Sequence, residues 1–364
     1  MADDATIDDE RALRGQGRGS RFFVLGRDHW ARLHTIETRN RLNLYITFLV
    51  LLAGTGSDNR TTKWSVTACD QHVGLGKPRA RVALDELIAA GLVERVEGAS
   101  RLTPQYRLPS VEAEEDPIFL PVQLVTGFAG EASVLRRIRE TGDPLLARML
   151  IDLYGLLQID ATYGVPLINL RRGEDGSSAR KIAELGIFAL WAVESGDPPH
   201  AMGDWAAPHR ATAGKGAEWA EFWARLSLLE KIGALVFEPW LYESAALDAE
   251  PMFPIDFGVL YSHRDEDEVS VLSRLLMRIA EHMTEGREYL LERYANDIIV
   301  PLPAHHQAPA VRGVAKLRIE ADTPGCRRAY ALRMRALEER RAAYERLLED
   351  VTQGRYDRPL GAGQ

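Results

Sequence analysis

Glycine, proline and a capping serine divide one stretch of the chain into short elements that leave few folds open. Ser65 is suited to cap the amino end of a helix over residues 66–73, and Gly74 is suited to end it. Pro78 fits the first turn of a second helix, and Gly91 fits just past its end. Two helices separated by so tight a turn are typical of a helix-turn-helix.

The flanking residues predict a helix before this stretch and a strand pair after it. Apolar residues recur at helical spacing over 42–53, and a polar loop follows at 57–63. Residues 92–96 and 105–108 have the composition of strands joined through a turn near 97–100. The predicted order is therefore helix, short helix, tight turn, helix and hairpin.

Residues 74–93, GLGKPRARVALDELIAAGLV, resemble the recognition helix and first wing strand of winged-helix DNA-binding regulators of the MarR and GntR kind. The resemblance implies a winged helix-turn-helix that places the basic amino end of its second helix in the major groove of double-stranded DNA. One face of this helix is expected to be buried, with Ala80, Ala83, Leu84, Leu87 and Ile88. The other is expected to be exposed, with Lys77, Arg79, Arg81, Val82, Asp85 and Glu86.

The candidate DNA contacts follow from side-chain chemistry. The guanidinium fork suits guanine O6 and N7, so we assign Arg79 and Arg81 to base edges. Phosphate contacts are expected from Lys77 and from Thr62, Lys63 and Ser65 at the start of the short helix. Arg101 in the wing is expected to reach the flanking minor groove or backbone, and the arm with Arg14, Arg18 and Arg21 is expected to lie in a minor groove. The alternative is that these are solvated charges on a winged helix that binds protein.

Charge is segregated along the chain, which has a formal net charge of -8. Residues 1–10 carry five acids and no bases, residues 11–107 carry 16 bases and 8 acids, and residues 108–364 carry 29 bases and 40 acids. The acidic total therefore conceals a basic region of the kind that phosphate binding requires. Arginine exceeds lysine throughout the chain, so this excess alone does not indicate function.

We predict an α+β fold, mainly α with small β wings, as tandem winged helices with a helical carboxy-terminal region. Residues 179–192 are read as a helix, and residues 236–242 and 255–261 as strands. The expected regions are a basic, partly flexible arm (1–40), a winged helix-turn-helix (41–110), a linker (111–142), a diverged second winged helix (143–262) and a mainly helical region (263–364).

The second module is inferred from residues 218–236, which repeat the apolar spacing of the first recognition helix. Two winged helices in one chain resemble plasmid replication initiators. The outward face of the second copy mixes acids and bases, so phosphate attraction is not built into it. Its aromatic residues, Trp219, Phe222 and Trp223, are expected to be core.

Helices over 268–294 and 329–351, with strands at 298–302 and 311–320 between them, are expected in the last third. Such amphipathic helices usually provide an interface. We therefore expect a homodimer, with protein partners as a further option through these helices or through the second winged helix.

Motifs for catalysis or cofactor binding are missing from the sequence. It contains no Walker A loop, dinucleotide fingerprint, nucleophile elbow or zinc-helix motif. The pair His305-His306 and the run 265–268 are poor metal ligands, because adjacent residues rarely point at one ion. Cys69 falls mid-helix, where the motif buries it. No enzyme activity, cofactor or metal is expected.

The sequence predicts a cytoplasmic, nucleoid-associated protein. The amino end is acidic and unlike a signal or transit peptide, no apolar run reaches membrane-spanning length, and there are two cysteines. The expected function is sequence-specific binding of double-stranded DNA, as a bacterial, phage or plasmid transcription regulator or a replication initiator. The alternative is an architectural winged-helix subunit of a chromosome-organising or defence complex that mainly binds protein.

Overall fold

The computed structural model describes residues 22–98, 104–111, 116–157, 162–167, 179–194, 217–246, 248–260 and 267–355. The chain forms two compact units, each assembled from segments that are distant in sequence. Unit 1 comprises Met1–Leu157, Ala207–Val236 and Leu317–Arg328, and unit 2 comprises Gln158–Ala206, Phe237–Lys316 and Ala329–Gln364. The five consecutive regions expected from the sequence therefore do not coincide with these units.

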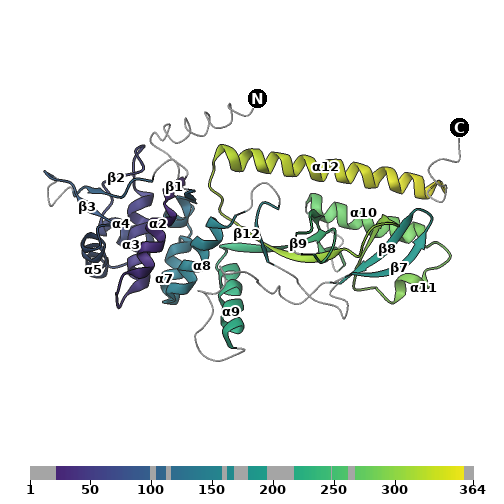
Figure 1. Ribbon diagram of the computed structural model, residues 1–364, viewed down its shortest axis with the longest axis horizontal. Helices are drawn as coiled ribbons and strands as arrows, with labels where there is room; N and C mark the ends of the chain where they lie inside the picture. The colour runs from purple at the N-terminus through teal and green to yellow at the C-terminus, as the bar shows by residue number, and fades with distance from the viewer. Residues whose placement is uncertain are drawn as a thin grey trace. The chain divides into compact units, whose positions relative to one another are not determined.

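Unit 1 is built mainly from helices, with two small sheets (Figure 1). Its elements are β1 (Phe22–Leu25), α2 (Arg27–Thr35), α3 (Arg41–Ala53), β2 (Thr61–Thr62), α4 (Val66–Val73), α5 (Lys77–Ala89), β3 (Glu94–Arg95), β4 (Tyr106–Arg107), β5 (Ile118–Pro121), α6 (Gln123–Thr126), α7 (Val134–Thr141), α8 (Pro144–Gly155) and α9 (Ala217–Lys231).

Helix α3 is the centre of unit 1. Ten of its 13 residues are buried, including a continuous run from Leu44 to Leu52. A helix that is apolar around its whole circumference is stable only when it is surrounded. Accordingly α4, α5, α7, α8 and β1 all pack against α3.

The elements from α3 to β4 form what we call the α3–β4 module, residues 41–107. The predicted ends of α4 and α5 are confirmed, because Ser65 accepts a hydrogen bond from the N–H of Thr67 and both Gly74 (φ +66°) and Gly91 (φ +67°) are left-handed. Strand β2 lies in the expected polar loop and pairs with β4, giving a three-stranded antiparallel sheet in the order β2-β4-β3.

Two segments expected to be an arm and a linker contain packed elements. In the first, β1 pairs antiparallel with β5, and Trp30 and Leu33 of α2 are buried. The indole of Trp30 donates a hydrogen bond of 2.8 Å to Asp152 on α8. In the second, α6 and α7 pack on α4. The partners of these segments lie far away in sequence, so the local pattern does not show how they pack.

Unit 2 is built on two antiparallel sheets. One has the order β10-β9-β12-β6 and the other β11-β8-β7. The elements are β6 (Val165–Leu167), β7 (Ala179–Leu185), β8 (Phe188–Val193), β9 (Leu235–Tyr242), β10 (Pro251–Pro254), the 3-10 helix η2 (Phe257–Leu260), α10 (Glu268–Met283), α11 (Tyr289–Glu292), β11 (Ile298–Pro303), β12 (Ala310–Leu317) and most of α12 (Pro324–Thr352).

The core of unit 2 lies between the sheets and helices α10 and α12. Strand β8 is almost fully buried, and β7 and β11 flank it on either side. Three side chains of α12, namely Leu337, Tyr344 and Val351, are buried in the same cluster. Helix α12 is therefore part of the fold of unit 2 and not a free-standing interface helix.

Two sequence predictions for this region are wrong. Residues 179–192 form the β7–β8 hairpin instead of a helix, because Gly186 adopts φ +61° at the turn and the apolar run is buried as a central strand. Residues 257–260, predicted as strand, form η2, and the partner of β9 is the earlier β10.

The fold is thus a mixture of helices and small antiparallel sheets, with more strand than a mainly α protein. The spacing over residues 218–236 does give a helix followed by a strand. However, β9 lies between β10 and β12 in a four-stranded sheet, and α9 packs on α8. Among the described residues, no helix is both long and apolar enough to cross a bilayer.

Gly54 provides a test of the packing in the α3–β4 module. A Cβ atom at this position would lie 2.2 Å from Cγ of Trp64. We expect Gly54→Ala to lower the free energy of unfolding of unit 1 by about 1–3 kcal/mol, the usual cost of overpacking. The control is Gly56→Ala, whose Cβ would meet no atom closer than 3.7 Å. Equal thermal unfolding curves for the two variants would contradict this packing.

Candidate nucleic-acid interface

Helix α5 presents one face to the core of the module and the other to solvent. Ala80, Ala83, Leu84 and Leu87 are buried as predicted, whereas Ile88, also predicted to be buried, is half-buried. Lys77, Arg79 and Arg81 are exposed, and Val82 is 54 % exposed although it is apolar. All four exposed residues belong to the first two turns, and the first turn carries the free backbone N–H groups that favour negative charge.

The acidic residues of α5 are engaged, whereas its basic residues are not. Asp85 forms an ion pair of 3.0 Å with Arg95 on β3, and Glu86 accepts a hydrogen bond of 2.9 Å from the hydroxyl of Thr38. Lys77, Arg79 and Arg81 make no hydrogen bond or ion pair with another described residue. The amino end of α5 therefore presents three uncompensated positive charges.

The strands after α5 add two basic positions that the sequence analysis did not select. Arg95 faces Tyr106 across the sheet, and Glu94 faces Arg107. Tyr106 is buried, and that burial raises the pKa of its hydroxyl, while Arg95 and Arg107 are exposed. For Arg107, alternation along β4 contained this information, since the neighbours of a buried Tyr point to the opposite face.

The residues at the start of α4 separate into two groups. Lys63 is exposed, and Ser65 is half-buried with its Oγ capping the helix. Thr62 is only 1 % exposed, and its hydroxyl donates to the carbonyl of Gly54 at 2.8 Å. The structure therefore does not bring Thr62 together with the exposed candidates, because β2 turns its side chain inward.

Four other candidates fall outside the residues that the structure describes. They are Arg14, Arg18 and Arg21 of the expected arm and Arg101 of the expected wing. The candidate interface is consequently built from the exposed residues of α5, β3, β4 and the segment before α4.

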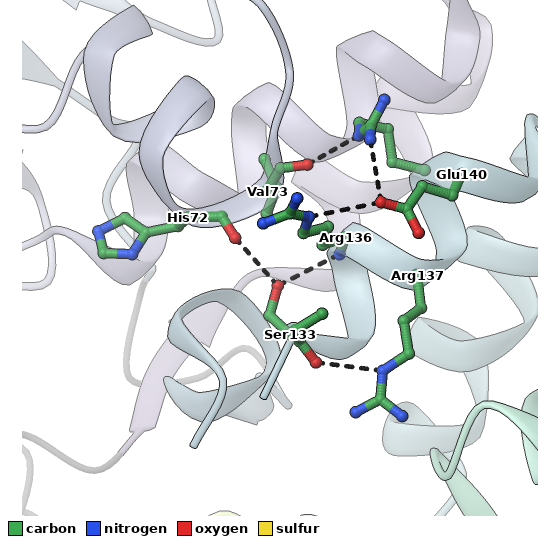
Figure 2. Close-up of polar contacts among 8 residues, drawn as sticks. His72, Val73, Ser133, Arg136, Arg137 and Glu140 are labelled. Atoms are coloured by element: carbon green, nitrogen blue, oxygen red, sulfur yellow. Dashed lines mark hydrogen bonds and ion pairs between the residues drawn. The ribbon is translucent and has the colours of Figure 1, made fainter. Parts of the chain in front are cut away.

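Helix α7 holds the carboxyl end of α4 in place (Figure 2). Ser133, which caps α7, donates from its Oγ to the carbonyl of His72 at 3.3 Å. The Nε atom of Arg139 donates to the carbonyl of Val73 at 2.7 Å. These bonds satisfy carbonyls that a helix end leaves free, and they fix the turn that leads into α5.

The described residues that could support catalysis or metal binding are not arranged for it. Cys69 is fully buried, and its burial raises the pKa of the thiol to about 12, so it does not form a thiolate near neutrality. Within the described ranges, no three His, Cys, Asp or Glu side chains are grouped so that they could hold a metal ion. The chemistry that this face offers is charge and hydrogen bonding.

His72 gives a prediction about pH. Its ring stacks on Trp64 with centroids 4.6 Å apart, and burial lowers the pKa of the imidazole from 6.5. Protonation therefore favours the unfolded chain, and this loss of stability begins as the pH falls through about 6.5. NMR titration should give an imidazole pKa below 6.5. His72→Phe keeps a stacking ring and should remove this part of the pH dependence; a measured pKa at or above 6.5 would contradict the packing.

The chain was compared with protein-family models, curated proteins and solved structures, and no match was found in any of the three.

Proposed function

We propose that the α3–β4 module is a winged helix that binds double-stranded DNA through the amino end of α5. The supporting observation is the imbalance on that helix: Asp85 and Glu86 have partners, whereas Lys77, Arg79 and Arg81 have none among the described residues. An exposed arginine without a partner costs little free energy in water, because water solvates its charge. Hydrogen bonds to a phosphate or to a guanine edge are strong, so such an arginine favours binding.

The side chains of this face fit both parts of DNA recognition. Arg79 and Arg81 have the planar fork that pairs with guanine O6 and N7, and Val82 offers an apolar contact to a thymine methyl group. Lys77 and Lys63 are point charges suited to phosphate oxygens. On β4, Arg107 is a further exposed base, and it lies opposite Glu94 of β3.

The order of elements supports the same proposal. The module runs from α3 through β2, α4 and α5 to the strands β3 and β4, and β2 pairs with β4. In a winged helix, this arrangement presents the second helix of the helix-turn-helix, here α5, to the major groove. The role that follows is transcription regulation or initiation of replication. The position of the bound sequence, in a promoter or in an origin, distinguishes the two.

A homodimer is part of the proposal, because paired modules read paired half-sites. Helix α12 carries two exposed apolar side chains, Tyr330 (52 %) and Leu332 (57 %). The test is the mass of the full chain in solution, since removing residues 263–364 would also remove the core side chains of α12. A single monomeric species at all concentrations would contradict the dimer.

The central experiment selects bound sequences from a random duplex pool and measures the affinity for them by mobility shift. We expect Arg79→Ala/Arg81→Ala to weaken specific binding by at least about 10-fold, because each bidentate base contact contributes about 1–3 kcal/mol. Lys77→Ala should weaken binding to all duplexes alike, and it should reduce the slope of log affinity against log salt concentration by about 1.

The matched control is Arg287→Ala/Arg293→Ala, which removes the same charge from exposed positions on either side of α11. This variant should bind like the unmodified protein. Affinity that is insensitive to salt, or that falls equally in both double variants, would contradict DNA binding by α5 and would favour the protein-binding alternative.

A further inference from the structure

A pocket lies in unit 1 between α6, the first turn of α7 and the segments that follow α9 and β12. Its volume is about 230 Å³. Drug-sized ligands usually occupy about 300–1,000 Å³, so this pocket suits a smaller molecule. It is lined by Gln123, Gly127, Phe128, Glu131, Ala132, Ser133, Val134, Arg137, Gly233, Arg318 and Ile319.

Two arginine side chains converge at this pocket. A Cβ atom built on Gly233 would lie 3.6 Å from Nη1 of Arg137 and 3.9 Å from Nη1 of Arg318. Both guanidinium groups therefore approach one point. Two like charges held together repel unless an anion lies between them, and guanidinium groups bind oxyanions through pairs of hydrogen bonds.

Arg137 is held rigidly, yet some of its donors have no partner among the described residues. Its Nε donates to the carbonyl of Ala132 at 3.1 Å, and its Nη1 donates to that of Ile232, at the end of α9, at 2.6 Å. Its Nη2 lies 3.8 Å from a carboxylate oxygen of Glu131, which is too far for a hydrogen bond. Figure 2 shows Arg137 pointing away from Val73, on the opposite side from the contacts to α4.

Arg318 is the more available of the two. Its side chain is exposed and makes no hydrogen bond or ion pair with another described residue, while its backbone N–H anchors it to the carbonyl of Ala234 at 3.0 Å. Among the described residues that line the pocket, Glu131 is the one carboxylate, and its side chain is 67 % exposed. An oxyanion that binds here displaces the exposed contact between Glu131 and Arg137, and this costs little free energy.

The remaining wall is partly apolar and preformed. Phe128 is 53 % exposed and contributes its ring to the lining. Gly127 adopts φ +69°, and a Cβ there would lie 2.7 Å from the carbonyl oxygen of Glu131, so the loop closes tightly on itself. The pocket therefore combines a cationic end with an apolar side.

We propose that this pocket binds a small molecule through an oxyanion, a phosphate or a carboxylate, held between Arg137 and Arg318. Ser133 lines the pocket and also donates to the carbonyl of His72 on α4. Occupation therefore stiffens the attachment of α7 to the end of α4. This inference does not depend on DNA binding.

The test is calorimetric titration of the full chain with inorganic phosphate and, separately, with benzoate, at constant ionic strength. Arg318→Gln should weaken binding at least about 10-fold, because it removes a charge-assisted contact without breaking a contact within the fold. Glu131→Gln should tighten binding, because it removes the competing carboxylate. Arg327→Gln, an exposed arginine outside the pocket, is the matched control and should leave binding unchanged.

The relative strength of the two probes distinguishes a phosphate ester from a carboxylate with an apolar group as the natural ligand class. Amide hydrogen exchange at the end of α4 should slow when either probe saturates the site. The proposal is overturned if neither probe binds, or if Arg318→Gln and Arg327→Gln weaken binding equally. Binding without slower exchange in α4 overturns the coupling.

Discussion

The burial of α3 on every side is the constraint on which the rest of unit 1 depends. Its run of apolar residues leaves no face for solvent, so the surrounding helices must each contribute an apolar stripe. Helix α5 contributes such a stripe through Ala80, Ala83 and Leu84, and this fixes which of its residues point outward. The exposed arginines of α5 are thus a consequence of how α3 is covered.

Elements marked by local chemistry could be predicted from the sequence. The Ser65 cap and the left-handed Gly74 and Gly91 place both ends of α4 and the end of α5 close to where the pattern puts them. The same reasoning separated the buried from the exposed residues of α5. These features need only neighbouring residues, so a single sequence contains them.

Elements that depend on distant partners could not be predicted. Strand β2 has two residues and exists because β4 pairs with it, so its sequence resembles a loop and Thr62 was misplaced. The apolar run of β8 fits a helix equally well until β11 and β7 flank it. The pocket at Arg137 brings together residues from three separate segments of the chain, and nothing in the local pattern of Arg318 indicated it.

The charge segregation along the chain is also visible in the contacts of α5. Of its charged residues, the acids are bonded to Arg95 and Thr38, and the bases at its amino end have no partner among the described residues. Net charge by segment indicated a basic region, but only the contacts separate charges that are used within the fold from those that are available to a partner.

Hydrogen-deuterium exchange of the full chain with and without double-stranded DNA at low salt tests this account most directly. If α5 binds DNA, added duplex should slow exchange at the amino end of α5, residues 77–82, and in the strands β3 and β4, and high salt should reverse the effect. Unchanged exchange in these segments, or protection confined to unit 2, would contradict it.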